Sequence, residues 1–180
     1  MEGFHIGVNN VKYNTNVGTL MRSAYQLGAT GVFTINKRYA KEKGDTFNVR
    51  KQIALTHHAS LEEFHEDRPV GVPLVAIEKG GEPLSTFQHP ERAIYILGDE
   101  DKGVPAEELA KCEYHISIEA ARHPMYNVSV AGSIVMYHRY YQQLEKARDE
   151  RRKRLGYVVV GALAAAMVVA FAVARRRDTA

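Results

Sequence analysis

The chain has 180 residues, of which 45% are hydrophobic and 25% charged. This composition excludes an intrinsically disordered chain and suits one domain with a substantial core. Its single cysteine, Cys112, excludes an internal disulfide framework and a zinc site built from several cysteines. The net charge of +3 hides an asymmetry, because residues 1–145 carry 15 Lys+Arg and 18 Asp+Glu, whereas residues 146–180 carry 9 and 3. The basic character therefore belongs to the C-terminal tail.

Strand-like and helix-like patterns alternate through residues 1–145. Apolar residues recur at helical spacing in 17–27, where Asn16 is expected to cap the helix and Gly28 to end it. In chain order we expect strand 4–8, helix 17–27, strands 31–35, 73–77 and 93–97, helix 105–112, strand 114–118 and a long helix from about Asn127. This alternation predicts an α/β fold with a mainly parallel sheet and helices on both faces.

Three acidic residues follow strand 93–97 directly, between two glycines. They are Asp99, Glu100 and Asp101, between Gly98 and Gly103. A calcium loop would need a bidentate glutamate at its twelfth position, where Ala110 stands. A plain surface turn remains an alternative at this stage.

Ligands of parallel α/β sheets bind beyond the carboxyl ends of the strands. Residues 9–22, residues 98–103 and the segment before Asn127 are therefore candidate walls of one site. The chain lacks G-x-G-x-x-G after its first strand, and it lacks G-x-x-x-x-G-K-[ST] and G-x-S-x-G throughout. These absences argue against the usual dinucleotide, P-loop and α/β-hydrolase sites.

A cluster of basic residues lies between positions 12 and 51, against only Glu42 and Asp45. Its members are Lys12, Arg22, Lys37, Arg38, Lys41, Lys43, Arg50 and Lys51. Such a basic face on an otherwise acidic domain can bind a polyanion, although a solvated run of charges has the same composition.

Three segments, in this order and at these separations, resemble the motifs of the SpoU branch of the SPOUT methyltransferases. They are NTNVGTLMRSAYQLGATGVF (14–33), YILGDEDKGVP (95–105) and ISIEAARHPMYNVSVAGSIVMY (116–137). The resemblance spans about residues 4–145. It implies methyl transfer from S-adenosylmethionine to a ribose 2′-hydroxyl of tRNA or rRNA. It also implies a deep trefoil knot in the C-terminal half and an obligate homodimer.

The resemblance implies catalytic roles for four residues: Asn16, Arg22, Glu100 and Asn127. Arg22, two turns after Asn16, matches an arginine proposed to contact phosphate and ribose and to help deprotonate the hydroxyl. We favour anchoring and orienting, because a guanidinium is a reluctant base; a surface ion pair is the alternative. Glu100 is expected to hold Arg22 and the knotted loop, while Asp99 and Asp101 are expected to be solvated. Asn127 is expected to cap the last helix and to reach the ribose.

The matching positions also imply binding residues. The cofactor residues are Ala76 or Ile77, Leu97, Gly98, Ile116, Ile118 and Tyr126. The RNA-binding residues are Lys12, Arg22, Lys37, Arg38, Arg50 and Lys51, and no metal is expected. Met125 stands where the family often has serine, which removes a hydroxyl near the reaction centre. An inactive RNA-binding or assembly protein of the same fold, and a small-molecule α/β enzyme, are the alternative functions.

The tail holds an uncharged run of 18 residues, Tyr157 to Ala174, which at about 1.5 Å per residue can cross a hydrocarbon core. A helix buried within a protein core is the alternative. We expect a methyltransferase domain at 1–145, a basic linker at 146–156, a transmembrane helix at 157–174 and a basic tail at 175–180. More basic residues precede the run than follow it, so we expect the catalytic domain to face the cytoplasm.

Overall fold

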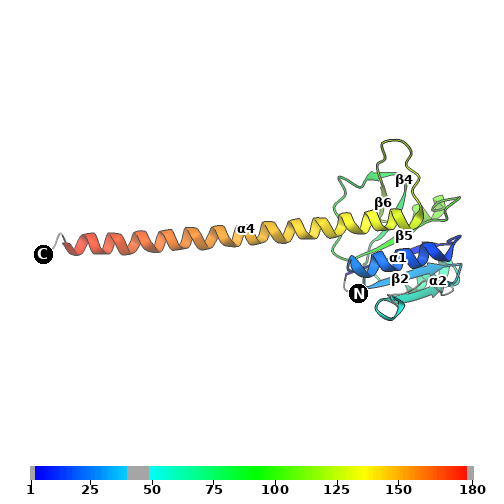
Figure 1. Ribbon diagram of the computed structural model, residues 1–180, viewed down its shortest axis with the longest axis horizontal. Coiled ribbons are helices and arrows are strands. Elements are labelled where there is room, and N and C mark those ends of the chain that lie inside the picture. The colour runs from blue at the N-terminus through cyan, green and yellow to red at the C-terminus, as the bar shows by residue number, and fades with distance from the viewer. Residues whose placement is uncertain (1–2, 40–48, 178–180) are drawn as a thin grey trace. The chain divides into compact units, whose positions relative to one another are not determined.

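The computed structural model describes residues 3–39 and 49–177, with side chains described as far as Leu155. Two of the clustered basic residues, Lys41 and Lys43, lie outside the described residues. The chain divides into two units, Met1–Tyr140 and Tyr141–Ala180. The last helix, α4 (Val128–Arg177), contributes its first turns to the first unit and the rest to the second (Figure 1).

Strands and helices alternate along the first unit, as the sequence predicts. The strands are β1 (Phe4–Asn9), β2 (Gly31–Ile35), β3 (Ala54–His58), β4 (Leu74–Pro83), β5 (Ala93–Leu97) and β6 (Tyr114–Ser117). The helices before α4 are α1 (Asn14–Gln26), the short 3₁₀ helix η1 (Val49–Lys51), α2 (Leu61–Asp67) and α3 (Ala106–Leu109). The bounds of β2 and β5 agree with the predicted ones, whereas β3 and α2 were not expected.

The six strands form one sheet in the order β3-β2-β1-β5-β4-β6, and every pair of neighbours is parallel. The chain moves outward from β1 to β2 and β3 on one side, and β5 pairs with β1 on the other side. The carboxyl ends of β1 and β5 therefore meet at a topological switch point, where sheets of this kind bind their ligands. The register aligns Val8 of β1 with Leu97 of β5 at this point.

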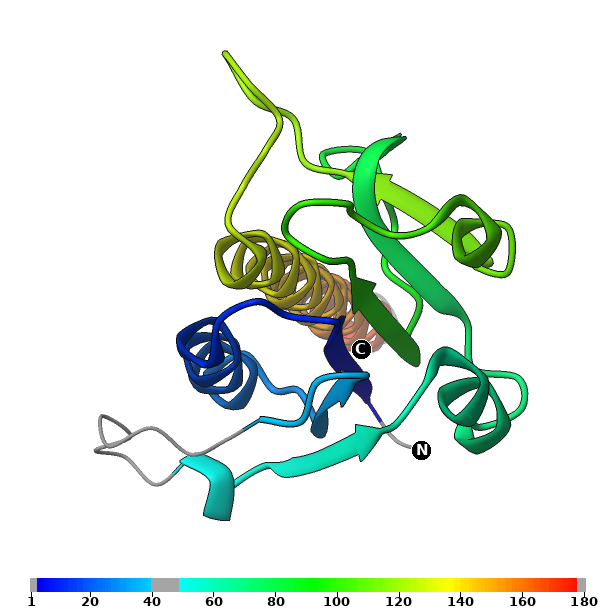
Figure 2. The same ribbon diagram turned by 90° about the vertical axis from the view of Figure 1, so that its right-hand side faces the viewer.

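Helices cover both faces of the sheet, as predicted, and each face has its own apolar core. Helix α1 and the first turns of α4 lie on one side of the sheet, and α2 and α3 lie on the other (Figure 2). One core joins β1, β4 and β5 to α1 and α4, and the other joins β2, β4 and β5 to α2 and α3. Close packing of α1 on α4 requires Gly132, because a Cβ there would lie 2.4 Å from Cδ1 of Leu20.

A buried arginine fixes the first part of α4 to the amino-terminal end of β5. Arg139 is only 2% exposed and donates hydrogen bonds to the main-chain oxygens of Pro90 and Glu91. Its guanidinium also lies 4.8 Å from the centre of the Phe4 ring and 3.3 Å from the hydroxyl of Tyr95. Burial raises the pKa of Tyr95 to about 12, so this hydroxyl stays neutral beside the guanidinium.

Within the part of the chain whose side chains are described, no helix is both long and apolar enough to cross a bilayer. The uncharged run 157–174 has side chains outside that part, so the membrane anchor stays a prediction. The same holds for the domain boundaries at residues 145, 156 and 174, and for the trefoil knot.

Candidate active site

Glu100, in the loop after β5, joins that loop to the connection between β1 and α1. Its Oε1 accepts a hydrogen bond of 2.8 Å from Nδ2 of Asn16, and its Oε2 accepts one of 2.8 Å from the main-chain N–H of Lys12. Both carboxylate oxygens therefore hold the two loops together at the switch point. The expected pairing of Glu100 with Arg22 stays a prediction, and Arg22 lies exposed on α1.

The two flanking aspartates also hold this junction, although the sequence suggested that they are only solvated. Asp99 Oδ2 accepts from Nδ2 of Asn10 at 2.7 Å, and its Oδ1 accepts from the main-chain nitrogens of Asp101 and Lys102. The hydrogen bond from Asp101 is the main cause that lowers the pKa of Asp99. Asp101 in turn pairs with the ammonium of Lys12 at 3.1 Å and raises the pKa of Lys12. Asp99, Glu100 and Asp101 therefore bind the loop after β5 to the β1–α1 connection through Asn10, Lys12 and Asn16. We call this hydrogen-bonded junction the clasp.

Asn16 links the clasp to the start of α4. The sequence suggested that Asn16 caps α1, and this prediction is wrong. The helix begins at Asn14, which places Asn16 inside the first turn. Its side chain is nearly buried, and its Oδ1 accepts a 3.1 Å hydrogen bond from Nδ2 of Asn127. Asn127 does cap its helix, since its Oδ1 accepts from the main-chain nitrogen of Ser129 at 3.0 Å. Glu100, Asn16 and Asn127, three of the predicted catalytic residues, therefore form one hydrogen-bonded series.

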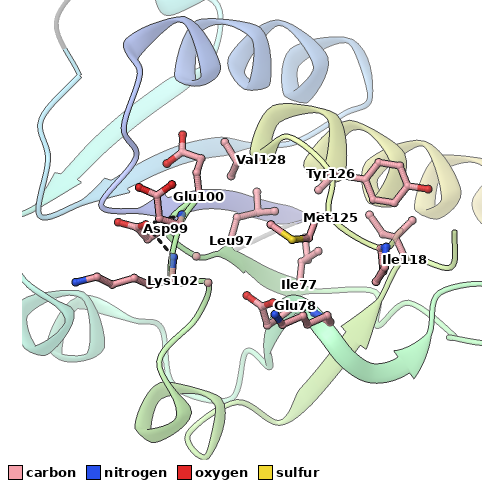
Figure 3. Close-up of a pocket in the computed structure, with 16 residues that line it drawn as sticks. Ile77, Glu78, Leu97, Asp99, Glu100, Lys102, Ile118, Met125, Tyr126 and Val128 are labelled. Carbon is pink, nitrogen blue, oxygen red and sulfur yellow. Dashed lines mark hydrogen bonds between the residues drawn. The ribbon is translucent and has the colours of Figure 1, made fainter. Parts of the chain in front are cut away.

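A pocket opens beside this series, at the carboxyl end of β5 and at the point in β4 where its pairing with β5 ends (Figure 3). The predicted cofactor residues that line it are Ile77, Leu97, Gly98, Ile118 and Tyr126. Two of the candidate walls, 98–103 and the segment before Asn127, also line it, through Asp99, Glu100, Asp101, Lys102, Gly103, Pro124 and Met125, and Ala131 of α4 lines it too. The lining residues that the sequence did not suggest are Glu78, Lys79 and Val128. Apolar side chains thus face carboxylates and ammonium groups across one cavity.

Two residues predicted to bind the cofactor do not line this pocket. Ala76 and Ile116 are fully buried in the two cores. Successive side chains of a strand point to opposite faces, so Ala76 packs against the core under α2 and α3 while Ile77 reaches the pocket side. The sequence did not decide between Ala76 and Ile77 as the cofactor residue, and the structure places Ile77 at the pocket.

The predicted RNA-binding residues are exposed but lie in separate places. Lys12 and Lys37 are neighbours, since the ammonium of Lys37 donates to the main-chain oxygen of Lys12. Arg50 and Lys51 lie on η1, which packs against α1. The structure therefore places basic side chains beside the clasp and along the α1 side of the sheet, where Arg22 also lies.

Solved structures resemble this fold. One described as giving insight into the 2-OH methylation of C/U34 on tRNA has a TM-score of 0.71 and 22% identity, over 80% of this chain and 98% of that one. The TrmH/SpoU tRNA modifying enzyme of A. aeolicus has a TM-score of 0.71 and 21% identity, over 82% and 78%. The AdoMet-bound rRNA methyltransferase of Sinorhizobium meliloti has a TM-score of 0.65 and 22% identity, over 79% of this chain and 57% of that one. These likenesses establish the SPOUT fold.

No curated protein matches the chain significantly. A family model described as the SpoU rRNA Methylase family matches residues 3–137, a stretch that contains all three motifs, the clasp and the pocket. The match confirms the resemblance that the motifs indicated, and the chain belongs to the SpoU rRNA methylase family.

Proposed function

We propose that the chain is an S-adenosylmethionine-dependent methyltransferase that modifies a ribose 2′-hydroxyl in tRNA or rRNA. The observation that carries this proposal is the hydrogen-bonded series Glu100–Asn16–Asn127 beside a pocket at the switch point of the sheet. Similar solved structures, at 21–22% identity, include AdoMet complexes of methyltransferases and one that concerns 2-OH methylation of tRNA, which supports the same chemistry here.

The pocket suits the proposed cofactor. Apolar side chains such as Ile77, Leu97 and Ile118 offer walls for a planar adenine, while the carboxylates of Asp99 and Glu100 favour a positively charged ligand. When bound, S-adenosylmethionine supplies the electrophilic methyl group. Residues of this chain have to align the ribose hydroxyl with it and ease loss of the hydroxyl proton.

The clasp prepares the residues that would meet the ribose. Asn127 donates one N–H of its amide to Asn16, and an amide nitrogen carries a second N–H that can bind a ribose oxygen. Glu100 keeps Asn16 in place, and Arg22 supplies a fixed positive charge on α1 for the adjacent phosphate. In this arrangement Arg22 anchors and orients the ribose, whereas Glu100 and Asn16 act through their neighbours.

The test is methyl transfer from labelled S-adenosylmethionine to total RNA by the purified chain, followed by mapping of the modified nucleotide. We expect label in tRNA or rRNA at a 2′-O position and a large loss of it in Asn127→Ala. RNA binding without any transfer would instead support an inactive RNA-binding protein. Absence of both RNA binding and transfer would favour a small-molecule enzyme.

We also propose a homodimer, as the resemblance implies. The first turns of α4 leave apolar side chains in solvent, with Val130 45% exposed and Tyr137 60% exposed, and a second copy would cover them. Light scattering during gel filtration reports the mass directly. A monomer mass at micromolar concentration would contradict the dimer and leave the proposed chemistry standing.

We further propose that 157–174 anchors the chain in a membrane with the catalytic domain in the cytoplasm. The run has no charged residue and follows a segment rich in basic residues: Arg148, Arg151, Arg152, Lys153 and Arg154. Only three arginines follow it. Such an excess of positive charge on one side orients a transmembrane helix with that side in the cytoplasm.

Cell fractionation checks the anchor. The full chain is expected to stay with membranes through a carbonate wash, because a spanning helix is held by hydrophobic burial that high pH does not weaken. A chain truncated after Lys153 is expected in the supernatant with its methyl transfer intact. Full chain recovered in the supernatant would contradict the anchor without affecting the methyltransferase proposal.

Met125 lies at the pocket with 62% of its surface exposed, in place of the serine common in the family. Met125→Ser adds a hydroxyl at this position and removes an exposed apolar side chain, so we expect turnover equal to or higher than that of the original chain. Initial rates at saturating RNA and cofactor measure the effect. A large loss of turnover would show that the thioether contacts the substrate.

A further inference from the structure

Glu78, in the middle of β4 and directly after the residues that pair with β5, holds the other side of the loop that Glu100 binds. Its Oε2 accepts a 2.9 Å hydrogen bond from the main-chain nitrogen of Val104, and its Oε1 accepts one of 3.0 Å from the main-chain nitrogen of Lys79. Its main-chain oxygen lies 3.1 Å from Nε2 of His115 on β6. Figure 3 shows the side chain at the floor of the pocket, below Ile77 and Met125.

The space taken by this carboxylate explains a glycine in the loop. Gly103 has φ +70°, which disfavours other residues, and a Cβ there would lie 2.1 Å from Oε2 of Glu78. On the far side of the same peptide, a Cβ at Gly98 would lie 2.1 Å from the carbonyl carbon of Gly103. The Gly103–Val104 peptide is therefore packed between the Glu78 carboxylate and the backbone of Gly98.

Glu78 and Glu100 thus fix the loop 98–104 from two sides. Glu100 binds the β1–α1 connection, whereas Glu78 binds the end of the loop nearest α3. Because Gly98 and Gly103 both line the pocket, a shift of the 103–104 peptide would change the shape of the cavity. A carboxylate that accepts main-chain N–H groups is a strong acceptor, which suits it to hold such a peptide.

We propose that Glu78 is a positioning residue, which sets the loop 98–104 in the shape that binds the cofactor. The inference rests on the proposed function, because it takes the pocket as the site of S-adenosylmethionine. Glu78 acts here through the Val104 N–H and not by contact with the methyl-bearing sulfur. Loss of Glu78 should therefore weaken ligands with and without the sulfonium charge alike.

Calorimetry on Glu78→Ala with two ligands tests this role. S-adenosylmethionine carries a sulfonium charge, and S-adenosylhomocysteine lacks it. We expect both affinities to fall by the same factor, about 10- to 100-fold, as for loss of a hydrogen bond to a charged group. Glu78→Gln keeps one carbonyl acceptor and is expected to recover part of the affinity. Glu82→Ala, an exposed glutamate on the same strand, is the matched control and is expected to change neither.

A double-mutant cycle with Gly103→Ala tests the packing. Gly103→Ala alone is expected to weaken both ligands strongly, since its Cβ meets the Glu78 carboxylate. In the Glu78→Ala background the same change is expected to cost less, because the obstructing atoms are gone. Additive losses would contradict the inferred packing. A thermal melt of each variant shows that the fold is kept.

Other outcomes are equally decisive. A loss confined to S-adenosylmethionine would overturn the positioning role and make Glu78 an electrostatic partner of the sulfonium. Unchanged affinity for both ligands in Glu78→Ala would refute the inference and leave the proposed function intact. If the original chain binds neither ligand, the proposed function itself fails.

Discussion

Replacing Gly98 with valine is expected to abolish cofactor binding. The reason lies in the backbone, since a Cβ at this position would come within 2.1 Å of the carbonyl carbon of Gly103 and 2.3 Å of the nitrogen of Val104. Neither atom can move without opening the loop that lines the pocket, because Val104 is held by Glu78. Calorimetry with S-adenosylmethionine is expected to show at least a 100-fold loss, equivalent to about 2.7 kcal/mol.

Alanine at the same position separates two explanations. If valine acted only by filling space that the cofactor needs, Gly98→Ala would bind much better than Gly98→Val. The backbone contact predicts that alanine is nearly as damaging, since the obstruction begins at Cβ. Gly18→Ala on α1 is the control, because its Cβ would meet only the Tyr39 hydroxyl at 3.5 Å. Normal affinity in Gly98→Val would refute the assignment of this loop to the cofactor.

Arg22→Ala is expected to lower methyl transfer by about 100-fold or more while S-adenosylmethionine affinity stays nearly unchanged. The guanidinium would be exposed to the phosphate and ribose of the target and would align the hydroxyl for attack. Arg22 lies on α1 and outside the lining of the cofactor pocket, which separates the two effects. Single-turnover rates with saturating RNA measure the transfer step, and calorimetry measures the cofactor.

Arg92→Ala is the matched control for this prediction. Arg92 is also exposed, but it precedes β5 and so lies at the opposite end of that strand from the clasp. We expect Arg92→Ala to retain turnover. A turnover of Arg22→Ala equal to that of the original chain would show that Arg22 takes no part in the reaction. Arg22→Lys distinguishes charge from geometry, since a lysine keeps the charge but loses the planar fork of donors.

The sequence predicts the main strands well because buried parallel strands are continuous apolar runs. Residues 93–97 form such a run and residues 31–35 do so apart from Thr34, and the structure has β2 and β5 at those bounds. The edge strand β3 is only partly buried, so its polar residues conceal it. Strand order also lies beyond local pattern, and only the order places the connection after β1 next to the loop after β5.

In the candidate site, too, the sequence identifies individual residues but not the contacts that depend on the fold. Motif matching brings out Asn16, Glu100 and Asn127, and the structure joins them by hydrogen bonds. It does not reveal that Asn16 lies inside the first turn of α1, because helix starts depend on the chain before them. Nor does it reveal Glu78, whose partner Val104 is 26 residues away in sequence. A lone glutamate directly after the predicted strand 73–77 carries no local signal for such a contact, and the sequence did not predict that β4 continues to Pro83.

The buried guanidinium of Arg139 gives α4 a fixed rotational setting. Arg139 lies 12 residues after Asn127, about 18 Å along the helix, and its hydrogen bonds to Pro90 and Glu91 hold that turn against the segment before β5. A helix turns by about 100° per residue, so a slip of one position would swing Asn127 away from Asn16. Arg139, at the amino-terminal end of the sheet, thus helps to orient the amide of Asn127 at the opposite end.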